Sequence, residues 1–181
     1  MNIETSRLLL KDYSINDFSN FFLLKTTKEV WEYSTFTPYQ SEEKALTDFH
    51  AILNNLSVNP YQFGALFTKD SNTFIGEAGI ISLNKNTDRC VIGYNLLPDY
   101  WGYGYATEIT KALVAHAFET LNVERAEALA MHLNPASCRV LEKSGFTLEG
   151  ILHHFTKIRN TYFDVCYYSI ISSDYFRLSK K

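Results

Sequence analysis

The stretch that decides the fold of this chain is Trp101-Gly102-Tyr103-Gly104-Tyr105-Ala106-Thr107. It follows the strand-like run 91–97 and leads into an amphipathic helical pattern over 108–121. A glycine-rich turn between a strand and a helix presents several backbone N–H groups at the positive end of the helix dipole. Glycine also lets the backbone approach a ligand closely. Because Gly-x-Gly occurs in plain turns as well, it is the order of strand, turn and helix that predicts a pyrophosphate-binding site here.

Length and composition predict one globular domain over residues 1–181. Of the 181 residues, 46% are apolar and 20% are charged, which suits a soluble protein with a buried core and argues against disorder. The net charge of −3 offers no basic surface for nucleic acid. No apolar run reaches the roughly 20 residues that a membrane span needs, and the N-terminal residues lack the apolar core of a signal peptide. We therefore expect a cytoplasmic protein that binds neither nucleic acid nor membrane.

The cysteines and histidines predict no metal site. The chain has an odd number of cysteines, and they lie far apart without Cys-x-x-Cys spacing: Cys90, Cys138 and Cys166. This argues against both a disulfide framework and a zinc site. His153 and His154 are adjacent on a predicted strand, so their side chains point to opposite faces. Free buried thiols in a reducing compartment are the simplest interpretation.

Hydrophobic periodicity and turn residues predict a chain in the order β-α-α-β-β-β-α-β-α-β-β. Ser14 and Ser41 are the expected N-caps of the first two helices. Polar turns separate the next three strands, which is typical of an antiparallel meander. The fold class is therefore α+β, with a mixed, mostly antiparallel, twisted sheet of about seven strands flanked by helices. The expected strands cover 3–13, 62–68, 73–83, 89–97, 124–133, 146–158 and 162–172, and the later helices cover 108–121 and 135–144.

Three segments form a recognisable set when they are taken together. They are Thr5-Ser6-Arg7-Leu8-Leu9-Leu10, then Ile92-Gly-Tyr-Asn-Leu-Leu-Pro98 with the glycine-rich turn up to Glu108, and Asn134-Pro-Ala-Ser-Cys-Arg-Val-Leu-Glu-Lys-Ser-Gly-Phe146. This set resembles the GNAT superfamily of N-acetyltransferases, and more narrowly the branch that contains ribosomal-protein alanine and serine N-terminal acetyltransferases. The resemblance covers nearly the whole chain. It implies a GNAT-like acyl-CoA N-acyltransferase fold, with acetyl-CoA as the co-substrate and an amine as the acceptor.

The resemblance also implies where coenzyme A binds. In the family the pyrophosphate turn reads Gln/Arg-x-x-Gly-x-Gly/Ala; Trp101, Gly104 and Ala106 occupy those places here, so Trp101 departs from the pattern. The amides of the turn are still expected to bind the phosphates. A splayed strand end would pair with the pantetheine arm, and the amide of Leu96 or Leu97 would polarise the thioester carbonyl. The implied cofactor-binding residues are Leu96, Leu97, Trp101, Gly102, Tyr103, Gly104, Tyr105, Ala106, Thr107, Asn134 and Ser137.

Acetyl transfer to an amine needs a neutral amine, donors for the oxyanion of the tetrahedral intermediate and an acid for the leaving thiolate. Many superfamily members carry a general-acid Tyr seven residues after the Asn that Asn134 matches, but here that position is Leu141. Ser137 is then the best substitute to protonate or hydrogen-bond the sulfur. The alternative is that Asn134 and Ser137 only cap the following helix. For Asn134, the sequence favours capping of the helix together with contact to the cofactor over a direct part in catalysis.

Glu77 is the candidate for the base. It lies on a predicted strand, in the run 75–81 that is otherwise without charge. A partly buried carboxylate among such neighbours would have a raised pKa and could relay a proton. The alternative, which the pattern somewhat favours, is a Glu on a solvated strand face. Glu127 and Glu32 are weaker candidates.

The aromatic loop 31–39 lies where the resembling branch places its acceptor-side elements. Trp31, Tyr33 and Phe36 wall a substrate cleft in one interpretation. In the other they pack into the core, which is the usual position of Trp and Phe. The sequence leaves both open.

The leading hypothesis is an acetyl-CoA-dependent N-acetyltransferase that acts on a primary amine, with a protein N-terminus as the first candidate acceptor. Direct attack in a ternary complex is expected, because Cys138 has no nearby His in sequence that would make it a thiolate. Small amines (a polyamine, an amino acid or an antibiotic) are the alternative acceptors. A non-catalytic acyl-CoA-binding regulatory module is the alternative from another class, and a homo-oligomer is left open. A Rossmann enzyme is disfavoured, because the turn lacks Gly-x-Gly-x-x-Gly spacing.

Overall fold

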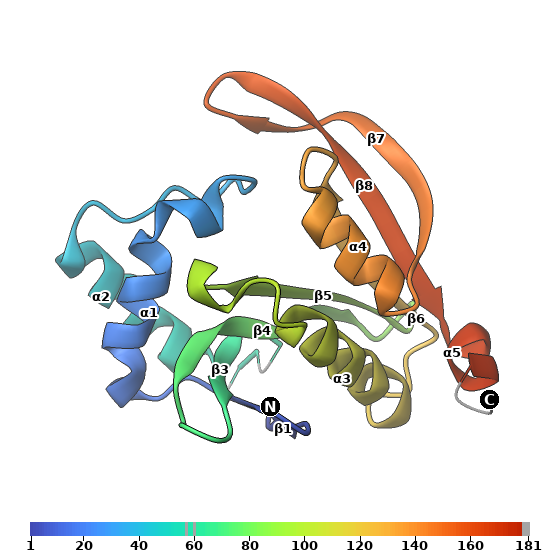
Figure 1. Cartoon of the computed structure of the whole chain (residues 1–181), viewed down its shortest axis with the longest axis horizontal. Coiled ribbons are helices and arrows are strands. Elements are labelled where there is room, and N and C mark those ends of the chain that lie inside the picture. The colour runs from blue at the N-terminus through green and yellow to red at the C-terminus, as the bar shows by residue number, and fades with distance from the viewer. Residues whose placement is uncertain (57, 60, 179–181) are drawn as a thin grey trace.

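One sheet runs through the whole molecule (Figure 1). The computed structural model describes residues 1–56, 58–59 and 61–178, and within these the strands form an eight-stranded sheet in the order β1-β2-β3-β4-β5-β6-β8-β7. Neighbouring strands are antiparallel except β5 and β6, which are parallel. The strands are β1 (Ile3–Glu4), β2 (Leu8–Lys11), β3 (Gly64–Thr68), β4 (Phe74–Asn84), β5 (Arg89–Leu96), β6 (Arg125–Met131), β7 (Thr147–Ile158) and β8 (Thr161–Ile171).

Helices pack on the sheet and create two cores. The first two long helices share one buried cluster with β3 and β4, and the next two contribute to another with the centre of the sheet. None of the helices within the described ranges is long and apolar enough to cross a membrane. The helices are α1 (Phe18–Thr26), α2 (Glu42–Asn55), α3 (Tyr105–Glu119), α4 (Pro135–Lys143) and α5 (Ser172–Leu178), with the 3-10 turns η1 (Ile15–Asp17), η2 (Lys28–Trp31) and η3 (Pro98–Tyr100).

The sheet differs from the sequence prediction at its N-terminal edge. The expected strand over 3–13 is two strands, β1 and β2, so the sheet has eight strands where about seven were predicted. The chain turns between them because the Thr5 amide donates to the Leu8 carbonyl (2.9 Å) and the Leu8 amide donates to the Thr5 hydroxyl (2.9 Å). The mixed, mostly antiparallel sheet with flanking helices is confirmed. α3 begins at Tyr105, earlier than predicted, since Gly104 is its N-cap.

β5 and β6 separate soon after they meet. Their parallel pairing joins Arg89–Val91 to Arg125–Glu127. β5 then continues to Leu96 along β4, while β6 continues to Met131 along β8. The C-terminal ends of the two strands therefore leave backbone groups without ladder partners on the edges that face each other. The splayed strand end that the family resemblance implied is therefore present at the end of β5.

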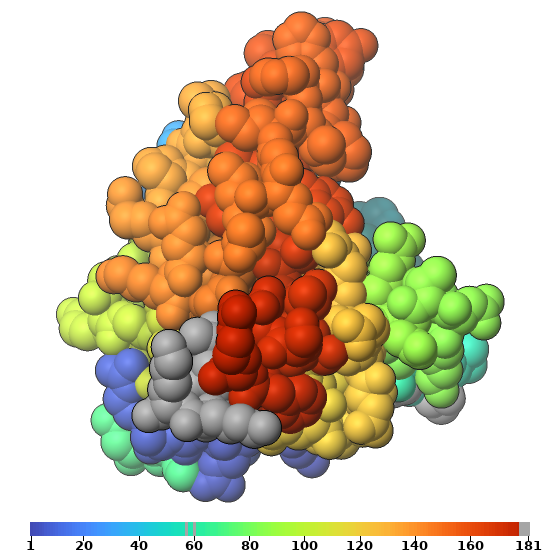
Figure 2. All heavy atoms as spheres, turned by 90° about the vertical axis from the view of Figure 1, so that its right-hand side faces the viewer, coloured from blue at the N-terminus to red at the C-terminus, as the bar shows by residue number. Residues whose placement is uncertain are grey.

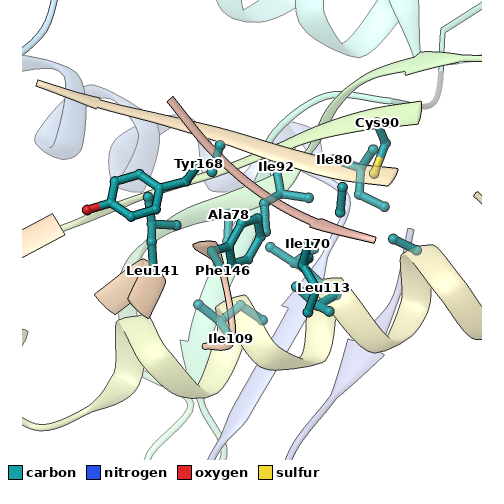
Figure 3. Close-up of a cluster of buried hydrophobic side chains, with 14 of the residues drawn as sticks. Ala78, Ile80, Cys90, Ile92, Ile109, Leu113, Leu141, Phe146, Tyr168 and Ile170 are labelled. Carbon is teal, nitrogen blue, oxygen red and sulfur yellow. The ribbon is translucent and has the colours of Figure 1, made fainter. Parts of the chain in front are cut away.

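The core beneath α3 fixes the start of that helix against the sheet. Ile109 and Leu113 of α3 and Leu141 of α4 pack with Ile92 and Phe146 (Figure 3). All five side chains are buried. Because full burial of such a side chain is worth about 1.5–3 kcal/mol, this packing holds the start of α3, and with it the glycine-rich turn, against the sheet.

The β7–β8 hairpin stands out from the body of the molecule (Figures 1 and 2). β7 is the edge of the sheet, and Phe155 and Tyr162 near the tip of the hairpin are exposed. An exposed apolar edge of this kind is compatible with a homo-oligomer, which the sequence left open.

A buried ion pair lies in the core under α1 and α2. Lys25 Nζ is 2.7 Å from Glu77 Oε1, and Glu77 is only 1% exposed. The ammonium also lies 4.4 Å from the centroid of the Trp31 ring, within cation–π range. The Glu77 carboxylate accepts further hydrogen bonds from the Tyr13 hydroxyl (3.2 Å) and Asn95 Nδ2 (2.8 Å). The interpretation of Glu77 as a residue on a solvated strand face is therefore wrong.

Lys25→Met should strongly destabilise the fold, because it leaves the Glu77 carboxylate buried without its cation. We expect a loss of about 3–5 kcal/mol in the free energy of unfolding. The matched control is Lys44→Met, which removes an exposed pair with Asp48 on α2 and should change stability by about 0.5 kcal/mol or less. Urea unfolding followed by circular dichroism measures both. Equally small losses in the two variants would contradict the buried-pair account.

Candidate active site

A cavity of about 770 Å³ opens where β5 and β6 diverge. Its walls come from β5, from the glycine-rich turn with the start of α3, from the end of β6 and from α4. Residues around η2 complete it. The cavity thus joins three regions that the family resemblance pointed to: the glycine-rich turn, the segment around Ser137 and part of the aromatic loop.

Hydrogen bonding distinguishes the two amides that were predicted to polarise a thioester carbonyl. The Leu97 amide donates to the Ile75 carbonyl (2.9 Å), on the β4 side of the chain. Because successive N–H groups of a strand point to opposite edges, the Leu96 amide points away from β4, toward the diverging β6. The Leu97 side chain packs in the core under α1 and α2, outside the cavity. Leu96 is therefore the candidate donor, and the position of Leu97 does not support its predicted contact with the cofactor.

Trp101 connects the turn to the end of β5. Its indole Nε1 donates to the Leu96 carbonyl (2.8 Å), while half of the Trp101 surface stays exposed. The Leu96 carbonyl belongs to the edge of β5 that β6 leaves without a ladder partner, so the indole satisfies one of these backbone groups. The residue that departs from the family pattern thus supports the mouth of the cavity.

The glycine-rich turn lines the cavity with its backbone. Gly102 (φ 83°) and Gly104 (φ 81°) adopt the left-handed conformation that glycine takes without strain. Gly104 is the N-cap of α3, and the first amides of a helix have no intrahelical partner. All the predicted turn residues line the cavity except Tyr103, which is exposed and stacks on Tyr105 (ring centroids 5.9 Å apart). Free amides at a helix N-terminus are suited to a phosphate.

Arg7 and Glu108 hold the turn in place, a role that sequence reasoning missed. Glu108 Oε1 accepts from the Thr5 hydroxyl (2.6 Å) and the Arg7 amide (2.9 Å), and Oε2 accepts from Arg7 Nε (2.6 Å). Burial alone would raise the pKa of Glu108, but the hydrogen bonds from Thr5 and Arg7 outweigh it and lower the pKa to about 2. Arg7 Nη1 also donates to the Tyr103 carbonyl (3.1 Å). The segment between β1 and β2 therefore fixes the start of α3.

Asn134 and Ser137 have separate functions at the start of α4. Asn134 Oδ1 accepts from the Ser137 amide (3.1 Å), so Asn134 is the helix cap. The Ser137 hydroxyl instead lies 3.2 Å from the Tyr94 hydroxyl of β5, and all three residues line the cavity. Sequence reasoning missed Tyr94, because a strand pattern does not show which helix its side chains face.

Glu77 does not line the cavity but reaches it through Asn95. Asn95 is the partner of Glu77 in the β4–β5 register, and Asn95 itself lines the cavity. Of the weaker candidates, Glu127 is buried outside the cavity, where it accepts from Arg125 Nε (2.7 Å). Glu32 is exposed and does line the cavity.

The aromatic loop is divided between core and cavity. Trp31 is buried, packs on Phe36 (ring centroids 4.5 Å apart) and donates its indole N–H to the Leu24 carbonyl (2.8 Å). Neither Trp31 nor Phe36 lines the cavity, so for these two residues the core interpretation holds. Tyr33 does line it. Glu29 and Glu32 lie beside Tyr33 and make this end of the cavity acidic.

Cys138 lies outside this cavity, although it follows Ser137 in the chain. It lines a second, smaller cavity of about 270 Å³ with His132 and Cys166. His132 Nδ1 contacts the Cys166 sulfur (3.4 Å). Burial raises the pKa of the Cys166 thiol to about 11. Across the residues that the structure describes, no three or more His, Cys, Asp or Glu side chains are grouped to hold a metal ion.

Comparison with known proteins agrees with this geometry. Residues 7–147 match the acetyltransferase (GNAT) domain family. The chain is 28% identical over 173 residues to the N-acetyltransferase p20 of Bacillus licheniformis, which covers 94% of this chain and 96% of that protein. In fold it is similar to a spermidine N-acetyltransferase from Vibrio cholerae, solved with CoA and spermine (TM-score 0.83, 22% identity, 95% of this chain and 99% of that chain). It is also similar to a structure from the same organism described as a ribosomal-protein-serine acetyltransferase (TM-score 0.78, 19% identity, 94% and 97%).

The family match spans most of the chain and includes the diverging strands, the glycine-rich turn and the start of α4. GNAT acetyltransferases use acetyl-CoA as the acetyl donor. The residues that line the cavity suit this donor, because they provide unpaired amides at a helix N-terminus and an open strand edge. The chain therefore belongs to the GNAT family and is an N-acetyltransferase.

Proposed function

We propose that this enzyme transfers the acetyl group of acetyl-CoA directly to a primary amine of a cationic acceptor, with a protein N-terminal amine as the leading candidate. The observation that carries the proposal is a single cavity with two chemically different ends. One end holds the turn around Gly104, and the other holds the exposed carboxylates of Glu29 and Glu32. Such a cavity suits a donor with a pyrophosphate and an acceptor with a positive charge.

Acetyl-CoA is held mainly by backbone groups in this proposal. The amides between Gly102 and Thr107 bind the pyrophosphate at the start of α3. The open edge of β5 at Leu96 pairs with the extended pantetheine arm. Arg139 and Lys143, exposed and one helical turn apart on α4, line the same cavity and add positive charge for the phosphates.

The chemistry needs two donors at the reacting thioester. The Leu96 amide stabilises the oxyanion that develops when the amine attacks. The Ser137 hydroxyl donates to the sulfur as the carbon–sulfur bond breaks. Cys138 lines the other cavity, which supports direct attack by the amine over an acetyl-cysteine intermediate.

The amine must lose a proton before or during attack. Glu77 was the candidate base, but Lys25, Tyr13 and Asn95 already donate to its carboxylate. Three donors occupy most of the acceptor positions of a carboxylate, which leaves little room for a hydrogen bond from the amine. We therefore assign Glu77 to holding Asn95 and β5 in position, and the proton leaves through water in the open cavity.

The acidic end defines the class of acceptor. Glu29 and Glu32 are exposed at η2, and within the described part of the chain neither forms an ion pair. A basic protein N-terminus and a polyamine both carry the complementary charge. A polyamine is the second candidate acceptor. It carries more than one cationic nitrogen, and the two carboxylates three residues apart could each pair with one of them.

Replacing either carboxylate should weaken the amine acceptor selectively. Glu29→Gln and Glu32→Gln should each raise KM for the amine by up to about fivefold, since an exposed charge pair contributes about 0.2–1 kcal/mol. KM for acetyl-CoA should not change, and the effect should shrink at high salt. Steady-state kinetics with spermidine and with a basic peptide bearing a free N-terminal amine measures this and ranks the two acceptors.

Glu43→Gln, on an exposed carboxylate of α2 outside the cavity, is the control and should keep the wild-type KM values. An unchanged KM for the amine in both variants at low salt would refute the acidic acceptor site. CoA binding by calorimetry without acetylation of any amine would support the regulatory-module alternative instead.

The mechanism predicts opposite results for two neighbouring residues. Ser137→Ala should lower kcat by roughly tenfold to a thousandfold and leave the affinity for acetyl-CoA nearly unchanged, because its hydrogen bond strengthens as charge develops on sulfur. Cys138→Ala should stay active. Mass spectrometry of enzyme incubated with acetyl-CoA and no amine tests the intermediate. An acetylated Cys138, together with an inactive Cys138→Ala variant, would overturn direct transfer.

A further inference from the structure

Two hydroxyl groups meet in the wall of the cavity, and the proposed acetyl transfer uses only that of Ser137. Tyr94 of β5 and Ser137 of α4 place their side-chain oxygens 3.2 Å apart, and both residues line the cavity. We propose that Tyr94 supplies the proton that Ser137 passes to the departing sulfur, so that the two hydroxyls form a proton relay. This inference rests on the proposed function and adds a residue that acts on the reacting atoms through Ser137.

The position of Tyr94 follows from the alternation of β5. Ile92 and Leu96, two residues to either side, belong to the core that contains residues of α3 and α4. Tyr94 lies on the same face of the strand and packs against this core. Its hydroxyl therefore reaches α4, while the Leu96 amide on the same strand points into the gap left by β6. One short segment of β5 thus positions both the relay and the proposed oxyanion donor.

The Ser137 hydroxyl is available for such a relay. Asn134 caps α4 through the Ser137 amide, which leaves the hydroxyl out of the capping interaction. Among the residues that the structure describes, Tyr94 is the hydrogen-bond partner of this hydroxyl. Leu141, where the resembling family places a tyrosine, lies one helical turn after Ser137 and is buried. The Tyr94 phenol therefore comes from β5 to the Ser137 hydroxyl, whereas α4 carries a leucine where the resembling family has its tyrosine.

Acid strength explains why a serine needs this partner. A thiol has a pKa of about 8.5 and a phenol about 10, so a phenol is a better proton source for a departing thiolate than an aliphatic hydroxyl is. An aliphatic hydroxyl holds its proton much more tightly. Ser137 can protonate the sulfur efficiently only if it regains a proton as it donates one.

The surroundings of Tyr94 keep it in the donor form. Burial raises the pKa of Tyr94, and the nearby Cys138 on α4 raises it further. The hydrogen bond with Ser137 acts in the opposite direction and lowers the pKa. Tyr94 is therefore protonated at neutral pH, as an acid must be before it acts.

The protons and electrons of the step balance. The amine nitrogen forms a bond to the carbonyl carbon, and the carbon–sulfur bond breaks with its electron pair moving to sulfur. The Ser137 proton goes to sulfur, and the Tyr94 proton goes to Ser137. The attacking amine releases one proton to water, and water returns one to the Tyr94 phenolate. The net products are the amide and the free thiol.

The first test does not depend on any acceptor. CoA is bound to the wild-type enzyme, Tyr94→Phe and Ser137→Ala, and its thiol is titrated by the ultraviolet difference absorbance of the thiolate. The relay donates a hydrogen bond toward the sulfur, so the bound thiol should titrate at a lower pH in the wild type than in either variant. Calorimetry should give similar CoA affinities for all three proteins.

The second test is kinetic. Tyr94→Phe should lower kcat by roughly tenfold to a hundredfold and by no more than Ser137→Ala does. The double variant Tyr94→Phe/Ser137→Ala should be no slower than Ser137→Ala, because residues of one relay do not act additively. The matched control is Tyr168→Phe. Tyr168 is also a buried tyrosine whose hydroxyl bonds to α4, at Glu142 (3.1 Å), but it does not line this cavity. It should keep the wild-type kcat and thiol titration.

The outcomes separate this inference from the proposed function. If Tyr94→Phe retains both the wild-type thiol titration and the wild-type kcat, the hydrogen bond is structural and the relay is overturned, while acetyl transfer stands. If the thiol titration shifts as expected but no amine is acetylated, the relay stands and the proposed acceptor class fails. Failure of the wild-type protein to bind CoA would overturn both.

Discussion

The short parallel pairing of β5 with β6 is the constraint on which the rest of the site depends. The two strands share a ladder only over Arg89–Val91 and Arg125–Glu127, and then diverge. Backbone groups beyond that point must find other partners, since buried polar groups of the main chain are rarely left unpaired. The Trp101 indole N–H donates a hydrogen bond to the Leu96 carbonyl, whereas the Leu96 amide points into the gap between β5 and β6. A strand edge of this kind is complementary to an extended chain with amide groups, as in a pantetheine arm.

The two cores give the two ends of the cavity different chemistry. The core under α3 and α4 supports the glycine-rich turn and the Tyr94–Ser137 pair, and the ion pair between Arg7 and Glu108 fixes the turn from outside. The core under α1 and α2 supports η2, which presents exposed carboxylates. Donor and acceptor sites therefore depend on separate packing units. In the proposed function, substitutions around η2 would change the acceptor without disturbing the acetyl-CoA site.

The sequence predicted the parts that depend on local order along the chain. The turn, its following helix and the meander all follow from residues close in sequence, whereas the splayed strand end was implied by the family resemblance. It could not predict interactions between distant segments. The Tyr94–Ser137 contact, the burial of Glu77 against Lys25 and the clamp on Glu108 each join residues more than forty positions apart. The split of the first strand was also missed, although the turn that breaks it is formed by local hydrogen bonds between Thr5 and Leu8. Glu108, a distant residue, also binds the Thr5 hydroxyl.

A crystal structure of the enzyme with CoA tests the central claim, that the gap between β5 and β6 is the acetyl-CoA site. The account predicts the pyrophosphate on the amides of the turn that begins at Gly102, the pantetheine arm paired with the Leu96 edge, and the sulfur within hydrogen-bond reach of the Ser137 hydroxyl. CoA bound elsewhere, or a pantetheine arm whose sulfur lies away from Ser137, would contradict it.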